Sequence, residues 1–197
     1  MTDLPAPLLP EGPPSAPFTS PEWVYELRFE GLPCMARVRP GASGDPARVR
    51  LRPAEGDMQA STAHPSIVQA LAALPGGPHV LEGTIARRHA GGPPHAGSDR
   101  LAAEAFCVSD LLVHAGEDLT ARPLVARKAR LRELLQAADP SAVLACGDLP
   151  ADADLLRALA ATGLGTTVVL ARRKDSAYPC ARGSPDWTVV DPSLAPG

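Results

Sequence analysis

The sequence lacks both an excess of positive charge, which would attract a nucleic acid, and a long apolar run, which would span a membrane. Its 197 residues hold 19 basic and 22 acidic side chains, a net charge of −3, so no overall positive field attracts a polyanion. No apolar run approaches the ~20 residues that span a bilayer, and no charged start precedes an apolar core. We therefore expect a cytoplasmic protein in which any contact with DNA is local.

Cysteine and lysine are scarce, and each shortage excludes a chemistry. The cysteines share no CxxC spacing, which argues against a zinc site or a disulfide framework and predicts small buried thiols. Only Lys128 and Lys174 supply an amine, so nearly every cation is an arginine. P-loop, serine-elbow and H-E-x-x-H patterns are also missing from the sequence. The four cysteines are Cys34, Cys107, Cys146 and Cys180.

Proline and glycine are abundant and mark the loops and ends of the chain. Many of the 23 prolines and 17 glycines lie near the N-terminus, around residues 89–99 and at the C-terminal end. Residues 1–20 are too rich in proline for a helix or a central strand, so we predict an extended arm on the surface. We expect one domain over residues 21–191 and a tail over 192–197.

Hydrophobic periodicity predicts an α+β fold with helices packed on largely antiparallel sheets. Three stretches between Glu22 and Pro53 alternate apolar and polar positions, which is typical of strands and suggests an antiparallel meander. Helical spacing follows at 65–76, 122–139 and 151–165, and we interpret the basic run of the second helix as a solvated face rather than a phosphate-binding one. Further strands are expected at 78–88, 103–114, 141–150 and 166–173, and residues 185–192 are expected to end the ordered part. Because strands do not alternate strictly with helices, the α+β class is favoured.

Five stretches, in order, resemble motifs of the adenylation domain of ATP-dependent DNA ligases, particularly the bacterial type associated with end-joining repair. In PLLPEGPPSAPFTSPEWVYELRFEGLP (7–33), Trp23, Glu26 and Gly31 match a W-x-x-E-x-K-x-D-G pattern. The others are VLEGTI at 80–85, SDLLVHAGEDLTARPLVARKARLRELL at 109–135, VVLARRKDSAY at 168–178 and DWTVVD at 186–191. The resemblance implies the ligase and mRNA-capping nucleotidyltransferase fold, which is similar to ATP-grasp. Nothing after Asp191 matches the OB-fold that follows in relatives, so we expect the chain to lack it.

The resemblance also implies a chemistry, which the residue at the nucleophile position contradicts. In that family a lysine amine attacks the α-phosphate of ATP, and AMP then passes to a DNA 5′-phosphate with the help of magnesium. Arg28 stands at the lysine position, and its guanidinium stays protonated and offers no lone pair. Lys128 and Lys174 lie far along the chain from this strand, so we expect no relocated nucleophile. Self-adenylation is predicted to be lost.

Other positions that hold the nucleotide in the family carry different side chains here. The arginine after the glycine becomes Pro33, the ribose-binding glutamate becomes Thr84, the adenine-stacking aromatic becomes Ser109, and a late lysine becomes Arg172. ATP and magnesium are expected as ligands only if the family pocket is retained. By position, the residues of such a pocket are Glu26, Arg28, Glu30, Gly31, Thr84, Ser109 and Arg172.

Three functions stay open at this point. The first is a non-catalytic homologue that binds DNA ends or a DNA-repair protein, and it is favoured because the nucleophile, ribose ligand and base stack are lost together while scaffold glycines and tryptophans remain. The second is a working nucleotidyltransferase that uses other residues or seals ends already carrying AMP. For it, Glu26, Glu30 and Asp110 could hold magnesium. The third is a remnant without a role.

One basic cluster late in the chain is a candidate DNA contact. It includes Arg172, and the residues we assign to a phosphate backbone are Arg173, Lys174 and Arg182. The alternative is that these cations solvate an edge strand, which is a common use of positive charge in sheets.

Overall fold

The structure is a computed structural model of the chain. It describes residues 4–8, 10–27, 29–42, 45–55, 60–87, 104–162, 169–179 and 183–195. Arg28, Arg182, Cys180 and the loop expected at 89–99 lie outside the described residues. No helix within the described ranges is long and apolar enough to cross a membrane.

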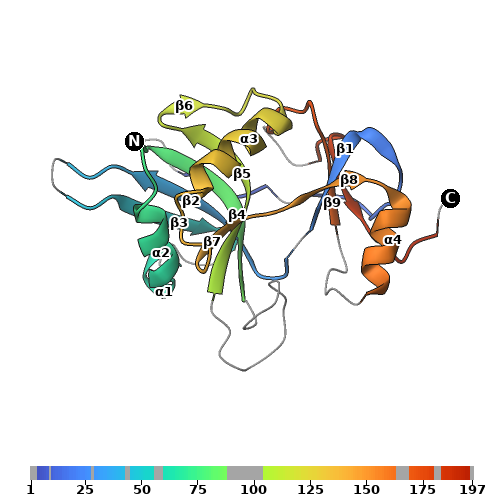
Figure 1. Ribbon diagram of the computed structural model, residues 1–197, viewed down its shortest axis with the longest axis horizontal. Coiled ribbons are helices and arrows are strands. Elements are labelled where there is room, and N and C mark those ends of the chain that lie inside the picture. The colour runs from blue at the N-terminus through green and yellow to red at the C-terminus, as the bar shows by residue number, and fades with distance from the viewer. Residues whose placement is uncertain are drawn as a thin grey trace.

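Two sheets lie side by side and divide the strands between them (Figure 1). The smaller sheet has the order β10-β9-β1-β8, and the larger has β3-β2-β4-β5-β6 with β7 beside β5. Among the strands of the described residues, β5 with β7 is the one parallel pair, and an isolated parallel bridge joins Ser15 to Val190. The strands are β1 (Ser20–Leu27), β2 (Leu32–Arg39), β3 (Arg48–Pro53), β4 (His79–Arg87), β5 (Glu104–His114), β6 (Glu117–Asp118), β7 (Val143–Ala145), β8 (Asp148–Ala151), β9 (Val169–Arg173) and β10 (Trp187–Val190).

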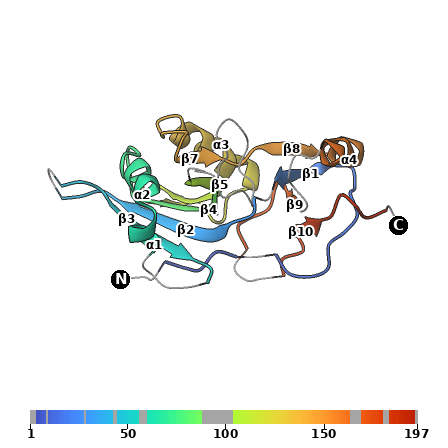
Figure 2. The ribbon, with the colours of Figure 1, turned by 90° about the horizontal axis from the view of Figure 1, so that it is seen from below.

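The helices cover one face of each sheet. Ile67 and Leu71 of α2, with Leu131 and Leu134 of α3, pack onto the apolar side of the larger sheet and form its core. Figure 2 shows α2 and α3 together on this side. Leu156 of α4 does the same for the smaller sheet. The helices are α1 (Ala60–Ala63), α2 (Pro65–Ala72), α3 (Leu124–Leu135) and α4 (Ala153–Ala161). The predicted α+β class with largely antiparallel sheets is confirmed.

Two sequence-based expectations about the strands were wrong. The first three strands do not form one meander, because β1 pairs with β8 and β9 while β2 pairs with β3 and β4. The stretch expected to be one strand at 141–150 is divided into β7 and β8, which belong to different sheets. Alternation shows which side of a strand is buried but carries no information about its partner, so the crossing from one sheet to the other was not visible.

The N-terminal arm is partly buried and is hydrogen-bonded to the rest of the protein. Leu4 is fully buried against Met35 and Leu112, and its carbonyl accepts a hydrogen bond from the guanidinium of Arg52. Further along, the Ser15 amide donates to the Val189 carbonyl at 2.8 Å beside β10. The arm therefore crosses the face of the larger sheet that the helices leave open and reaches the smaller sheet (Figure 2).

Gly83 marks the place where two strands of the larger sheet approach too closely for any side chain. A Cβ at this position would lie 2.3 Å from the carbonyl oxygen of Cys107 on β5. A Cβ on Gly147, in contrast, would meet no atom within 4 Å, so this glycine offers a matched control.

We expect Gly83→Ala to lower the free energy of unfolding by about 1–3 kcal/mol, because the sheet must open to admit the methyl group. Gly147→Ala should leave it unchanged or raise it by up to about 1 kcal/mol through the unfolded chain. Urea unfolding of the two variants beside the unchanged protein measures this, and equal stabilities of the two variants would contradict the close approach.

Candidate functional site

The two sheets are joined by buried ion pairs centred on Arg172. This residue lies on β9 in the smaller sheet and is 1% exposed. Its guanidinium donates to Asp110 on β5 of the larger sheet at 2.5 Å and to Glu26 on β1 at 3.3 Å. The ring of Trp187 lies under it, 4.2 Å from the guanidinium carbon. One arginine thus holds a carboxylate from each sheet.

Helix α3 supplies two more buried cations to the same cluster. Arg127 donates from Nε and Nη2 to the two oxygens of Asp110, both at 2.9 Å, in a bidentate pair. Lys128 contacts Glu26 and lies 2.6 Å from Asp148 of β8. The basic run of this helix was expected to be a solvated face, and for these two residues that was wrong, since Arg127 is fully buried and Lys128 is 2% exposed.

Neighbouring charges favour the ionised forms of Asp110 and Lys128 in this cluster. Burial alone would raise the pKa of Asp110, but Arg172 and Arg127 outweigh it and the net pKa is lowered. Burial likewise favours a neutral Lys128, yet the carboxylates of Glu26 and Asp148 raise its pKa above the ordinary value. Removing one partner would leave a buried charge uncompensated, so the cluster is a stability requirement of the fold.

A small cavity lies beside the cluster, between the sheets and under the arm. Its volume is about 70 Å³, well below the roughly 300–1,000 Å³ of typical ligand pockets. Prolines, leucines and two thiols make up much of its wall. The lining residues are Pro7, Leu8, Pro10, Glu26, Leu27, Phe29, Pro33, Glu82, Gly83, Thr84, Cys107, Ser109, Cys146, Leu170, Arg172 and Trp187.

Glu82, which lines this cavity, is hydrogen-bonded to the N-terminal arm. Its Oε1 accepts a hydrogen bond from the Leu8 amide at 3.2 Å and one from the Tyr178 hydroxyl at 3.1 Å. No cation lies within ion-pair distance of it among the described residues. Burial raises the pKa of Glu82 to about 7, although Arg172 draws it down in part. The carboxyl is therefore divided between its neutral and charged forms near neutral pH.

Comparison with known proteins was made both by sequence and by fold. No protein-family model matches the chain. The multifunctional non-homologous end joining protein LigD of Pseudomonas aeruginosa is 32% identical over 174 residues, which is 84% of this chain and 20% of that protein. Mycobacterial DNA ligase D complexed with ATP and MES superposes with a TM-score of 0.72 and 25% identity, over 94% of this chain and 60% of the other.

The chain belongs with the adenylation domains of ATP-dependent DNA ligases of the end-joining type. The ligase domain of LigD from M. tuberculosis gives the same TM-score of 0.72 at 24% identity. The chain spans a fifth of the Pseudomonas protein and about three fifths of the mycobacterial structures. The expected family and fold are both confirmed.

Four of the residues assigned to the ligase pocket by position are brought together. Glu26, Thr84, Ser109 and Arg172 all line the cavity. The Ser109 hydroxyl is turned back to the carbonyl of Glu82, to which it donates at 3.2 Å. Ser109 therefore offers no flat surface to a base.

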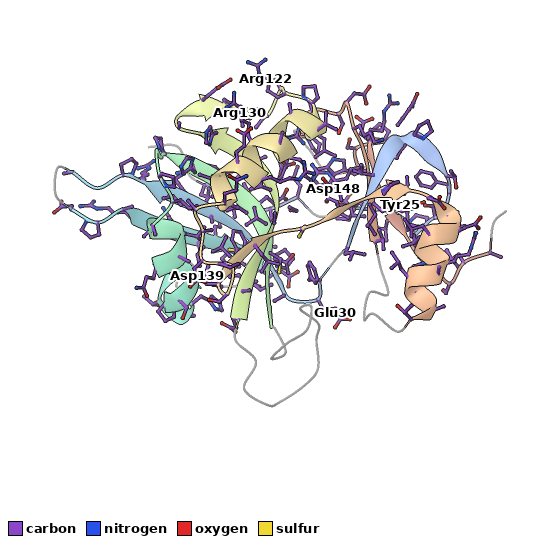
Figure 3. All side chains as sticks on the ribbon, in the orientation of Figure 1. Tyr25, Glu30, Arg122, Arg130, Asp139 and Asp148 are labelled. Carbon is purple, nitrogen blue, oxygen red and sulfur yellow. The ribbon has the colours of Figure 1, made fainter. Side chains whose placement is uncertain are left out.

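The other two described residues assigned to the pocket, Gly31 and Glu30, do not line the cavity. Gly31 is held beside β4, where a Cβ would lie 2.2 Å from the Ile85 carbonyl oxygen, so it is required by backbone packing. Glu30 is exposed and points away from the protein at the lower edge of Figure 3, whereas Asp148 lies near the middle of the view. Glu30 is consequently not part of the cavity wall.

Magnesium does not fit the acids that the sequence offered for it. Glu30 is exposed, whereas Glu26 and Asp110 are buried and share the guanidinium of Arg172. Within the described ranges, no group of three histidine, cysteine or acidic side chains is placed to hold a metal ion. A hard cation needs several free oxygens, and the oxygens of Glu26 and Asp110 face cations already.

The late basic cluster is dispersed rather than continuous. Arg172 is buried, which removes it from any surface, and β9 is an interior strand of its sheet. Arg173 lies 3.1 Å from Asp175 and 3.6 Å from Asp186, and its pKa is raised by these carboxylates. Lys174 donates to the Pro21 carbonyl. Solvation of an edge strand was thus a wrong description, and the assignment of Arg173 and Lys174 to DNA stays a prediction.

Sequence reasoning missed the proximity of Lys128 to the pocket strand. The chain separates it from Glu26 by about a hundred positions, yet the fold places its amine against that carboxylate. The carboxylates of Glu26 and Asp148 raise the pKa of this amine, which disfavours its neutral, nucleophilic form, and the absence of a relocated nucleophile stays a prediction. The sequence gives no indication that the face of α3 with Lys128 packs against the strand with Glu26.

Arg127→Met should lower the free energy of unfolding of the ligase-like domain by about 3–5 kcal/mol, because Asp110 loses its bidentate partner in a buried site. Arg130→Met, one turn along the exposed face of α3, is the control and should change stability little. Denaturant unfolding compares the two, and similar losses would contradict a central role for the buried pair.

Glu82 predicts a pH dependence of stability with a definite sign. Its pKa rises from 4.5 in the unfolded chain to about 7 in the folded one, so the folded state binds more protons between these values and stability falls as pH rises through this window. At about 1.4 kcal/mol per pKa unit, the loss is about 3 kcal/mol. In Glu82→Gln this component should vanish, while the exposed Glu133→Gln keeps it. Parallel pH–stability curves for all three proteins would contradict the assignment.

Proposed function

We propose that the chain is an end-joining-type ligase adenylation domain that does not adenylate itself and acts by binding a DNA end or a DNA-repair partner. The observation that carries this proposal is the ion-pair cluster at the cavity. Glu26 and Asp110 are neutralised by Arg172, Arg127 and Lys128, all from the chain itself. A nucleoside triphosphate and its metal ion would need free cations and free carboxylates, and in this site both are already paired with each other.

The shape of the site supports the same conclusion. The cavity of about 70 Å³ is several times smaller than typical ligand pockets. Leu8 and Pro10 of the arm close one side of it, and the Glu82 hydrogen bond holds the arm there. Pro33 on its wall has no N–H to offer a phosphate.

The nucleophile position supports the proposal from the chemical side. By the match to the ligase motifs, the attacking lysine is replaced by Arg28, which cannot supply a free amine. Lys128, whose amine contacts Glu26 of the pocket strand, also pairs with Asp148, and these two carboxylates favour its protonated form. Formation of a phosphoramidate therefore lacks its first reactant.

Incubation with α-labelled ATP and magnesium, followed by denaturing electrophoresis, tests the catalytic half of the proposal. We expect no labelled protein from the natural sequence. We also expect none from Arg28→Lys, because the rest of the pocket stays closed by its own ion pairs. An active ATP-dependent DNA ligase serves as the positive control.

A labelled adduct on the natural sequence would overturn the proposal. A label on Arg28→Lys alone would show that the pocket accepts ATP and is not closed by its ion pairs. Nicked DNA that already carries AMP at its 5′-phosphate tests the alternative of a working enzyme, and sealing of this substrate would favour that alternative.

A further inference from the structure

The hairpin of β2 and β3 carries a row of arginines on one face. In β-strands, alternate side chains share a face, and paired residues on neighbouring strands lie on the same side. The register places Arg37 opposite Arg50 and Arg39 opposite Arg48. The apolar residues between them, Ala36, Val38 and Leu51 among them, turn to the core on the other side. Arginines of both strands are thus gathered on the face away from α2.

This positive charge is not balanced within the hairpin. Residues 32–53 contain five arginines and a single carboxylate, Asp45, in a chain whose net charge is −3. The fifth arginine, Arg52, is engaged with the Leu4 carbonyl of the arm.

The like-charged pair of Arg39 and Arg48, directly opposite each other on β2 and β3, is unfavourable for folding by itself. Opposite like charges on neighbouring strands destabilise a sheet. Cations on an edge strand discourage pairing with another sheet, which accounts for those on β3. Protection of an edge strand does not account for Arg39, because β2 is an interior strand between β3 and β4. An external polyanion would turn this repulsion into attraction.

The arginine row is continuous with the cavity along one strand. Pro33 of β2 lines the cavity, Met35 lies under the arm, and Arg37 and Arg39 follow on the same face. At about 3.3 Å per residue, the stretch of β2 from Pro33 at the cavity to Arg39 is roughly 20 Å long. The hairpin projects beyond the rest of the larger sheet (Figure 1), and the arm crosses nearer the sheet centre (Figure 2).

We infer that the arginine face of the β2–β3 hairpin binds the phosphate backbone of duplex DNA. The inference rests on the proposed DNA-binding function and assigns it a surface. Arg39 and Arg48 are the exposed pair at the end of the hairpin, whereas Arg37 and Arg50 are half-buried and also take part in contacts within the chain. Because the contact is with phosphates, its affinity depends on charge and salt concentration, and it gives no specificity for base sequence.

The test is fluorescence anisotropy of a labelled blunt duplex with the whole chain, over a series of salt concentrations. Arg39→Gln with Arg48→Gln should weaken binding at least several-fold and reduce the slope of log K against log salt by about 2, one for each phosphate contact. Arg39→Lys with Arg48→Lys keeps the charge and should retain most of the binding.

The matched control is Arg122→Gln with Arg130→Gln, which removes the same charge from exposed positions labelled at the top of Figure 3. It should leave the salt slope near that of the natural sequence. Thermal unfolding separates a binding defect from a folding defect, because removing the Arg39–Arg48 repulsion should maintain or raise the melting temperature.

Equal weakening by the hairpin and control variants would overturn the hairpin assignment while leaving DNA binding elsewhere on the protein. If the natural sequence does not bind duplex DNA even at low salt, both the hairpin assignment and the DNA-binding half of the proposed function fail. Neither result affects the adduct assay, so DNA binding and the loss of self-adenylation are tested separately.

Discussion

The structure depends on one guanidinium that joins two sheets. Arg172 reaches from β9 of the smaller sheet to Asp110 of the larger one while it also holds Glu26 of its own sheet. Arg127 and Lys128 enter from α3 and complete the pairing. Such a cluster is expensive to desolvate and is stable only when every member is paired. The relative position of the sheets is therefore set at the wall of the cavity, which Glu26 and Arg172 both line.

Under the proposed function, this arrangement accounts for a ligase fold that persists without self-adenylation. A pocket for ATP needs unpaired cations for the phosphates, free carboxylates for a metal and space for a base. In this chain the cations and carboxylates neutralise one another, and the N-terminal arm covers what space remains. Fold and function are separable in this way because packing of the two sheets does not require the reaction.

The sequence was sufficient for the fold class, most element positions and the family, because each depends on local periodicity or on ordered motifs. Alternation located β2, β3 and β4, and helical spacing located α2 and α3. Partner choice was not predictable, so β1 was placed in the wrong sheet. The burial of Arg127 and Lys128 was also missed, since a charged residue on a helix is normally solvated and only tertiary structure supplies its partner. The arginine row had a visible signal, five arginines at alternate positions on two adjacent strands, which becomes meaningful once their register is known.

The central claim is that the ligase pocket is closed by the chain's own charges. Isothermal titration of the folded protein with ATP in the presence of magnesium tests it most directly, because it needs neither turnover nor a covalent product. We expect no saturable heat at any ATP concentration up to the millimolar range. Saturable one-site binding of ATP, abolished by a substitution at Arg172, would contradict the claim.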